Sequence, residues 1–205
     1  MNKNNTYTDL VGRRSSNAIS DECYTPSDQV LPLLEYLNKD NTYYEATSGK
    51  SNLIVDGFNK NGYKIVPSND KDFFDCGPDD VYDGIITNPP YSIKDKFIEH
   101  CYSLGKPFAL LLPVTSFQGG KRGKMFIKHG MSTLVYNNRV DFTGTGNPTF
   151  GNAWFMWGII PSNTIYWVDN PKNGQLQYTT EDKKPWVLRK RKDNTAKSFD
   201  NLFDL

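Results

Sequence analysis

The sequence is poor in the two residue types that most often bind metals or form covalent cross-links. It has three cysteines and two histidines among 205 residues. The cysteines are odd in number and scattered, which argues against a disulfide framework. The histidines have no cysteine or histidine partner at the spacing of a zinc site. These residues are Cys23, Cys76, Cys101, His100 and His129. We therefore expect reduced thiols and no bound metal.

Long apolar runs are also missing. No run approaches the roughly 20 residues that a membrane-spanning helix needs. Residues 1–8 are polar, unlike the apolar core of a signal peptide. Together with the lack of a disulfide framework, these features predict a cytoplasmic protein that does not contact a membrane.

The net charge is only +1, so overall charge does not indicate a nucleic-acid-binding protein. The charges are nevertheless unevenly distributed. Residues 119–139 and 183–192 contain several lysines and arginines and no acidic residue, whereas residues 70–83 are rich in aspartate. Local basic segments can bind phosphates on a chain that is neutral overall, and otherwise they form a solvated surface. The residues that we consider for nucleic-acid contact are Lys121, Arg122, Lys124 and Arg139.

Helical and strand-like patterns alternate along most of the chain. Helical spacing of apolar residues occurs in 25–37, 53–60, 93–104 and 121–129. Strand-like segments occupy 43–45, 63–66, 82–87, 107–112, 133–137, 153–160 and 164–168. The alternation predicts an α/β fold with a doubly wound, Rossmann-like sheet, mostly parallel with an antiparallel C-terminal portion. The Leu-rich strand at 107–112 should be buried on both faces.

The length of the chain suits one folded domain. Residues 1–20 are rich in Asn, Ser and Arg, and we expect a flexible N-terminus there. The folded domain is expected over residues 21–170, followed by a basic C-terminal tail over 171–205. Residues 120–152 have room only for a loop and one helix. No separate target-recognition domain is therefore expected, and a protein partner is a possible source of target recognition.

The most informative string is Asn88-Pro89-Pro90-Tyr91, which directly follows the strand at 82–87. Open α/β sheets bind their ligands at the carboxyl ends of the strands. Two successive prolines fix the backbone and remove two N–H donors. The result is a rigid turn that presents the Asn88 carboxamide oxygen and backbone carbonyl oxygens, which are acceptors suited to a ligand NH2 group.

An aryl amine is a poor nucleophile because its lone pair is delocalised into the ring. Acceptors that bind both amine protons localise that lone pair and direct it at a methyl donor. Tyr91 adds a flat face on which a flipped base can stack, a contact worth roughly 1–3 kcal/mol per base in single-strand binders. The pattern therefore favours methylation of an exocyclic amine.

The string Asn88-Pro89-Pro90-Tyr91 resembles motif IV of amino-group methyltransferases that use S-adenosylmethionine. Other segments resemble further elements of the adenine-N6 DNA methyltransferases. Residues 24–26 resemble the opening motif, 45–51 the glycine-rich cofactor loop, and 72–74 the element beside the adenine of the cofactor. Residues 140–157 resemble the closing strands of phage and plasmid enzymes. The order of these motifs is that of the gamma arrangement.

The resemblance implies an enzyme of a bacterium or a phage-infected cell that methylates the N6 amino group of adenine in DNA. It implies S-adenosylmethionine as the cofactor and a target base that is flipped out of the duplex. It assigns catalysis to Asn88, Pro89, Pro90 and Tyr91. It assigns cofactor binding to Tyr24, Thr25, Pro26, Glu45, Thr47, Gly49, Asp72, Phe73 and Asn88.

The cofactor loop departs from the family pattern. Ala46 and Ser51 replace a proline and a second glycine, and Ser68 lies where the second strand usually ends in an acid. A Cβ at position 51 can crowd a close backbone approach, so we expect weak cofactor affinity. Two alternatives stay open: a non-catalytic binding or partner subunit with a methyltransferase fold, and an enzyme acting on RNA or protein glutamine. A phosphate-binding P-loop does not fit, because Tyr44 occupies the position of its first glycine.

Overall fold

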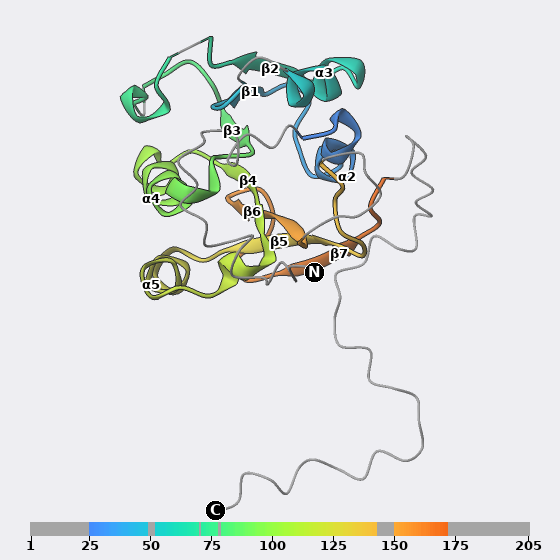
Figure 1. Cartoon of the computed structure of the whole chain (residues 1–205). Coiled ribbons are helices and arrows are strands. Elements are labelled where there is room, and N and C mark those ends of the chain that lie inside the picture. The colour runs from blue at the N-terminus through green and yellow to red at the C-terminus, as the bar shows by residue number, and fades with distance from the viewer. Residues whose placement is uncertain (1–24, 49–51, 70, 78, 143–149, 172–205) are drawn as a thin grey trace, which may run out of the picture.

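The computed structural model describes residues 25–48, 52–69, 71–77, 79–142 and 150–171 of the chain. The N-terminus expected over residues 1–20 and the tail beyond Pro171 lie outside these ranges, as do Tyr24 and Gly49. The described residues form a seven-stranded sheet with helices on both faces (Figure 1).

The strands cross the sheet in the order β2-β1-β3-β4-β6-β5-β7. Neighbouring strands are parallel except at β6, which runs antiparallel to both β4 and β5. Their bounds are β1 (Thr42–Glu45), β2 (Lys64–Pro67), β3 (Gly84–Thr87), β4 (Phe108–Pro113), β5 (Ser132–Tyr136), β6 (Asn152–Trp157) and β7 (Ile165–Val168). The predicted fold class is confirmed, and the antiparallel portion is a single reversed strand.

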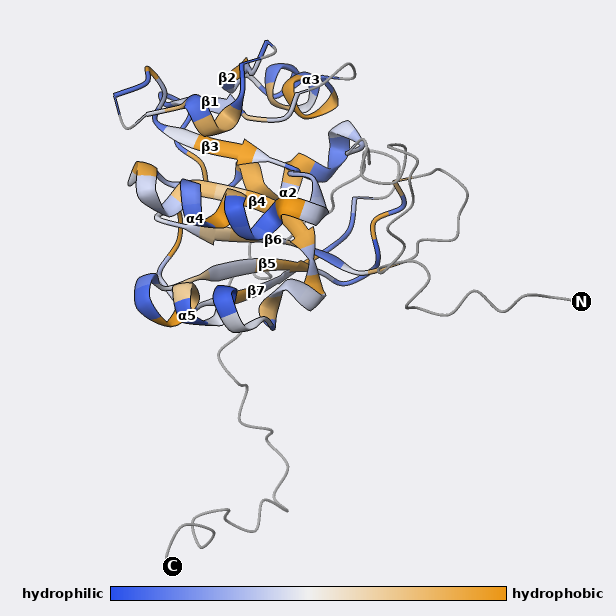
Figure 2. Cartoon of the chain, turned by 60° about the vertical axis from the view of Figure 1, so that its left-hand side comes forward, coloured by the Kyte–Doolittle hydropathy of each residue, from blue (hydrophilic) through white to orange (hydrophobic). Residues whose placement is uncertain are grey.

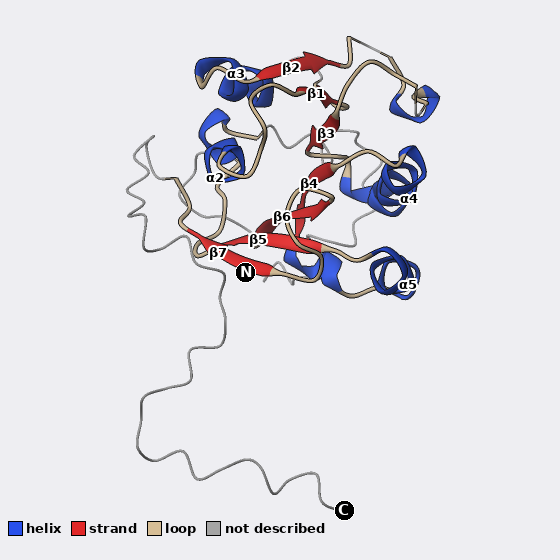
Figure 3. Cartoon of the chain, turned by 180° about the vertical axis from the view of Figure 1, so that it is seen from behind, coloured by secondary structure: helices blue, strands red, loops and turns tan. Residues whose placement is uncertain are grey.

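Helices cover the two faces of this sheet in separate pairs (Figure 3). One face carries α2 (Leu31–Leu34), preceded by the 3-10 turn η2 (Ser27–Val30), and α3 (Leu53–Lys60). The other face carries α4 (Lys94–Leu104) and α5 (Gly120–His129). Shorter 3-10 turns are η3 (Phe73–Asp75), η4 (Tyr91–Ile93) and η5 (Val114–Phe117). Each face of the sheet therefore packs its own apolar layer against a pair of helices.

Strand β4 forms the centre of both apolar layers. Phe108, Leu110 and Leu112 point to the α4 side, while Ala109 and Leu111 point to the α2 side. All five side chains are fully buried, which confirms the prediction that this strand is covered on both faces. Figure 2 shows the same concentration of apolar residues along β3 and β4.

Two predicted boundaries are wrong. The helix expected over 25–37 is instead η2 followed by the short α2, and Pro32, near the start of α2, has no N–H to continue an α-helical ladder from the preceding turn. The strand expected over 153–160 ends at Trp157. Gly158 follows with φ of 71°, in the left-handed region that favours glycine, and turns the chain beside Pro107.

Gly57 allows α3 to approach η2 closely. A Cβ on this residue would lie 2.3 Å from the backbone oxygen of Ser27 and 2.7 Å from Cγ2 of Val30. The backbone oxygen has no rotamer by which it can move away, so a side chain here displaces one element from the other. The contact sets the position of η2, and with it that of the preceding residues Thr25 and Pro26.

We therefore expect Gly57→Ala to destabilise the protein by about 1–3 kcal/mol, the usual cost of overpacking. A glycine-to-alanine change inside an unobstructed helix has the opposite sign, because alanine has the higher helix propensity. Gly123→Ala in α5 is the matched control, since no atom lies within 4 Å of a Cβ built there. Chemical denaturation of both variants measures the difference. Equal stabilisation by both changes would contradict the packing argument.

Candidate active site

The turn Asn88-Pro89-Pro90-Tyr91 lies at the carboxyl edge of the sheet, directly after β3. Strand β1 ends at the same edge with Glu45, because β1 and β3 are parallel. Strand β6 is reversed and begins at this edge, where Asn152 pairs with Pro113 at the end of β4. Three segments that are distant in the sequence thus meet around the predicted catalytic turn.

The carboxamide of Asn88 is oriented by the segment that precedes η2. Its Nδ2 donates a hydrogen bond to Oγ1 of Thr25 at 3.0 Å. Thr25 is buried, with 4% of its surface exposed. The hydrogen bond from the amide nitrogen fixes the plane of the carboxamide, and the Oδ1 atom of the same group is buried. The structure therefore places Thr25, predicted to bind cofactor, directly against the predicted catalytic amide.

Glu45 and two threonines connect the ends of β1 and β3. Oε1 of Glu45 accepts hydrogen bonds from Thr87 Oγ1 at 2.6 Å and from the Thr47 backbone N–H at 2.9 Å. The Thr47 hydroxyl lies 3.2 Å from the same oxygen and 3.1 Å from the backbone oxygen of Asn88. The beginning of the predicted cofactor loop is thereby fixed to the catalytic turn.

The other predicted cofactor residues lie at the same edge in different surroundings. Asp72 is exposed, and its carboxylate accepts a hydrogen bond from the Phe74 N–H at 3.0 Å. Phe73 is buried and stacked on Phe97 with 4.8 Å between ring centroids, so its ring belongs to the core. The aromatic surface next to Asp72 belongs instead to Phe74, which is 38% exposed. Pro26 is partly buried at the start of η2.

Two contacts of Tyr91 come from residues that the sequence analysis did not identify. Asn152 Nδ2 donates a hydrogen bond to the Tyr91 hydroxyl at 2.9 Å. The Phe150 and Tyr91 rings pack in a T-shaped arrangement, with 5.8 Å between centroids and 70° between planes. These residues belong to the stretch that resembles the closing strands of the family, but nothing local in the sequence indicates that they reach Tyr91.

The predicted nucleic-acid-binding residues are not equivalent. The Arg122 side chain pairs with Asp95 and donates to the backbone oxygens of Ser116 and Gln118, and only 12% of it is exposed. Arg122 thus links α5 to α4 and to residues 116–118, which precede α5, and its guanidinium is engaged in contacts within the protein.

The three other basic residues of this set are exposed. Lys121 forms an ion pair with Glu99 at 2.6 Å, in which both side chains are more than half exposed. Such surface pairs contribute little energy and are readily exchanged for another anion. Lys124 lies one turn further along α5, and Arg139 lies in the loop after β5. These three residues thus differ from Arg122, whose side chain is largely buried.

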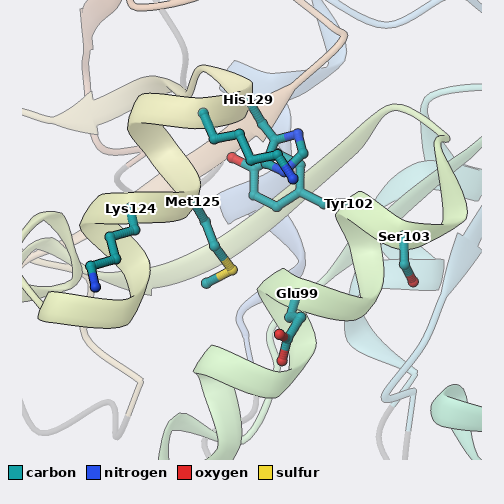
Figure 4. Close-up of a pocket in the computed structure, with 7 residues that line it drawn as sticks. Glu99, Tyr102, Ser103, Lys124, Met125 and His129 are labelled. Atoms are coloured by element: carbon teal, nitrogen blue, oxygen red, sulfur yellow. The ribbon is translucent and has the colours of Figure 1, made fainter.

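A surface groove of about 370 Å³ separates α4 from α5 (Figure 4). Both helices follow a strand that ends at the Asn88 edge and lead back to the opposite edge, so their last turns are remote from Asn88. The groove is lined largely by those last turns, at Tyr102, Ser103, Lys128 and His129. It is therefore separate from the candidate active site.

The described residues contain no group of three or more His, Cys, Asp or Glu side chains that could hold a metal ion. Cys76 and Cys101 are both buried free thiols. Among the helices in the described ranges, none has the length and apolar character needed to cross a membrane.

Comparison with known proteins identifies relatives by structure alone. No protein-family model and no curated protein matches the sequence. A modification subunit assigned to a type I restriction enzyme from Vibrio vulnificus YJ016 superposes with a TM-score of 0.53 and 14% identity, over 82% of this chain and 51% of that one. A chain from a structure of complex assembly and conformational transition in a type I R-M system gives 0.50 and 14%, over 77% and 46%.

A third structure, assigned to class I S-adenosylmethionine-dependent methyltransferases from Listeria monocytogenes, gives a TM-score of 0.48 at 12% identity and adds nothing to the fold assignment. The first two likenesses show that the chain shares its α/β fold with the modification subunit and with the chain from the type I R-M system. The chain spans about half of the length of those two proteins.

Burial raises the pKa of Glu45 from its ordinary 4.5 to about 7, although hydrogen bonds from Thr87 and Thr47 act in the opposite direction. The folded protein thus binds this proton more tightly than the unfolded chain does. The resulting stabilisation is complete below about pH 4.5 and is lost as the pH rises through about 7. The lost free energy amounts to roughly 3 kcal/mol at 1.36 kcal/mol per pKa unit.

Glu45→Gln keeps the shape of the side chain and removes its titration. We expect the stability of this variant relative to wild type to increase by roughly 3 kcal/mol between pH 4.5 and pH 8. Denaturant unfolding at several pH values measures the difference. Glu99→Gln, at an exposed position of α4, should show no comparable trend. A constant difference between Glu45→Gln and wild type would mean that the buried carboxyl does not titrate in this range.

Proposed function

We propose that this chain is a methyltransferase domain that transfers a methyl group from S-adenosylmethionine to the N6 amino group of adenine in DNA. The observation that carries the proposal is the orientation of Asn88. Its amide nitrogen donates to the buried Thr25, which orients the carboxamide at the carboxyl edge of the sheet, directly after β3. The similarity in fold to a type I modification subunit and to a chain of a type I R-M system is consistent with a role in DNA modification.

The polar groups of this edge suit a cofactor that carries positive charge. S-adenosylmethionine has a sulfonium and an ammonium group, and the exposed Asp72 carboxylate is the group of this edge that can pair with positive charge. The buried Glu45 carboxyl and the hydroxyls of Thr25 and Thr47 offer hydrogen-bonding atoms. When bound, the cofactor supplies an electrophilic methyl group. We assign its binding to these four residues, with Tyr24, Pro26 and Gly49 as further candidates from the sequence.

Asn88 and the turn act on the nucleophile. The Asn88 Oδ1 atom accepts one proton of the target amine, and a carbonyl oxygen of the proline turn accepts the other. With both protons engaged, the lone pair of the amine no longer delocalises into the ring and is directed at the methyl group. Thr25 keeps the amide from rotating, so the acceptor is in place before the substrate arrives, as electrostatic preorganisation requires.

Tyr91 supplies the surface for the base. Tyr91 is partly buried, and its ring is fixed by a T-shaped contact with Phe150 and by a hydrogen bond from Asn152 to its hydroxyl. A base removed from a duplex loses its stacking partners, and a rigid aromatic ring replaces part of that interaction. The contacts that hold the Tyr91 ring in place therefore help to stabilise a base that has left the duplex and stacks on this ring.

The alternatives predict other substrates or no transfer. A non-catalytic subunit is favoured by the departures from the family pattern at Ala46 in the cofactor loop and at Ser68 after β2. Ser68 Oγ is hydrogen-bonded to Ser48 Oγ at 2.8 Å. A transfer assay with radiolabelled S-adenosylmethionine on duplex DNA, RNA and protein substrates separates these possibilities. Transfer to none of them, with no heat of cofactor binding, would establish the non-catalytic role.

Asn88→Ala should lower the rate of methyl transfer by at least a factor of about 100, the usual result of removing one preorganised hydrogen-bonding group. The fold should persist, because the lost side chain is at the end of a strand and not in the apolar layers. Asn59→Ala, at an exposed position of α3, is the matched control and should retain full activity. Near-normal turnover of Asn88→Ala would contradict the adenine-methylation hypothesis.

The exposed lysines of α5 should contribute to DNA binding through phosphate contacts. Replacing Lys121 and Lys124 together by glutamine should weaken binding to all duplexes alike, and should make the dependence of log affinity on log salt shallower by up to about 1.8, or 0.9 per phosphate contact. Fluorescence anisotropy of a labelled duplex at several salt concentrations measures this slope.

The double change Lys60→Gln with Lys64→Gln is the control for that measurement. Both lysines are exposed, but they lie where α3 ends and β2 begins, at the edge opposite Asn88. This control should leave the slope unchanged. An equal slope in both double variants would mean that the α5 lysines do not contact the DNA phosphates.

A further inference from the structure

Asn152 is a buried polar residue at a position where the fold does not require one. It is the first residue of β6, and only 1% of its surface is exposed. Its backbone pairs with that of Pro113 at the end of β4, which any residue can do. Because β6 is the reversed strand, the Asn152 side chain is delivered to the edge that carries the Asn88 turn.

The two ends of this amide differ. Nδ2 donates to the Tyr91 hydroxyl at 2.9 Å. Oδ1 is shielded from solvent and accepts no hydrogen bond from any residue in the described ranges. A buried acceptor left in this state destabilises a protein, and an apolar side chain of similar volume would avoid that loss. Fold stability therefore does not explain an amide here, whereas its bond to Tyr91 does.

The segment containing Asn152 is anchored independently of Tyr91. The Val114 N–H donates to the backbone oxygen of Gly151 at 2.9 Å, which fixes residues 150–152 to the end of β4. From this base, Phe150 packs in a T-shaped contact with the Tyr91 ring and Asn152 donates to the Tyr91 hydroxyl. At the other end of the residue, Lys94 Nζ donates to the Tyr91 backbone oxygen at 2.8 Å. The Phe150 contact constrains the plane of the ring, and the bond from Asn152 constrains the direction in which the ring points.

We propose that Asn152 is a positioning residue that holds the Tyr91 ring in the one orientation in which a planar nucleobase can stack on it. This proposal rests on the proposed function for the identity of the base, but the constraint on Tyr91 exists without substrate. Asn152 acts through the Tyr91 hydroxyl, so its contribution disappears when that hydroxyl is absent.

The substrate-free test measures the Tyr91 side chain itself. In protein with selectively labelled tyrosine, the NMR couplings across χ1 of Tyr91 should indicate one rotamer in wild type and averaging among rotamers in Asn152→Leu. The melting temperature of Asn152→Leu should equal or exceed that of wild type, because the buried acceptor is gone. Asn59→Leu, on the exposed side of α3, is the matched control and should leave the couplings unchanged. A single Tyr91 rotamer in folded Asn152→Leu would overturn the proposal.

The enzymatic test adds the consequence for the substrate. Asn152→Leu should raise the KM for DNA about tenfold with a smaller effect on kcat, because base stacking contributes to the bound state before the transfer step. Tyr91→Phe should show the same change, and the double variant should be no worse than either single one. Additive effects would mean that Asn152 acts apart from the hydroxyl and would overturn the proposal. Absence of transfer by wild type would refute the proposed function alone, since the NMR result stands without it.

Discussion

The backbone oxygen of Gln29 is the acceptor on which the arrangement of the active-site edge depends. The Tyr136 hydroxyl donates to it at 2.5 Å and the indole N–H of Trp154 lies 3.2 Å away, all of them inside the protein. Tyr136 ends β5 and Trp154 lies in β6, so these two neighbouring strands both bind η2. Hydrogen bonds in such a dry environment are strong and costly to break. They fix η2 on the sheet, and η2 in turn fixes Thr25 beside Asn88.

This attachment explains how a short segment with little regular structure can orient a catalytic amide. Only η2 and α2 separate Thr25 from β1, and neither is long enough to be stable alone. The Gln29 contacts hold the segment to the sheet, and the close approach at Gly57 holds it to α3. The segment that contains Thr25 is therefore held by both the sheet and α3, and the hydrogen bond between Asn88 and Thr25 has a defined direction.

The polar residues at the carboxyl edge are hydrogen-bonded to one another and are largely shielded from solvent. Glu45, Thr47 and Thr87 share one set of hydrogen bonds, and the set reaches the backbone oxygen of Asn88. Burial raises the pKa of Glu45 to about 7, so this carboxyl titrates near neutral pH beside the turn that bears Asn88. The basic residues of α5 differ from one another in burial. The Arg122 side chain is largely buried and links α5 to α4, whereas Lys121 and Lys124 are exposed.

Local sequence features determined most of the secondary structure. The periodic apolar residues predicted α3 with the bounds that the structure shows, and the Leu-rich run predicted the doubly buried β4, because helix and strand periods are properties of neighbouring residues. The paired prolines likewise identified the turn that bears Asn88. What tertiary structure alone decided is which distant residues meet this turn. Thr25 reaches Asn88 across 63 positions and Asn152 reaches Tyr91 across 61. These contacts depend on strand order and on the reversal of β6, which arise from long-range pairing and leave no local pattern in the sequence.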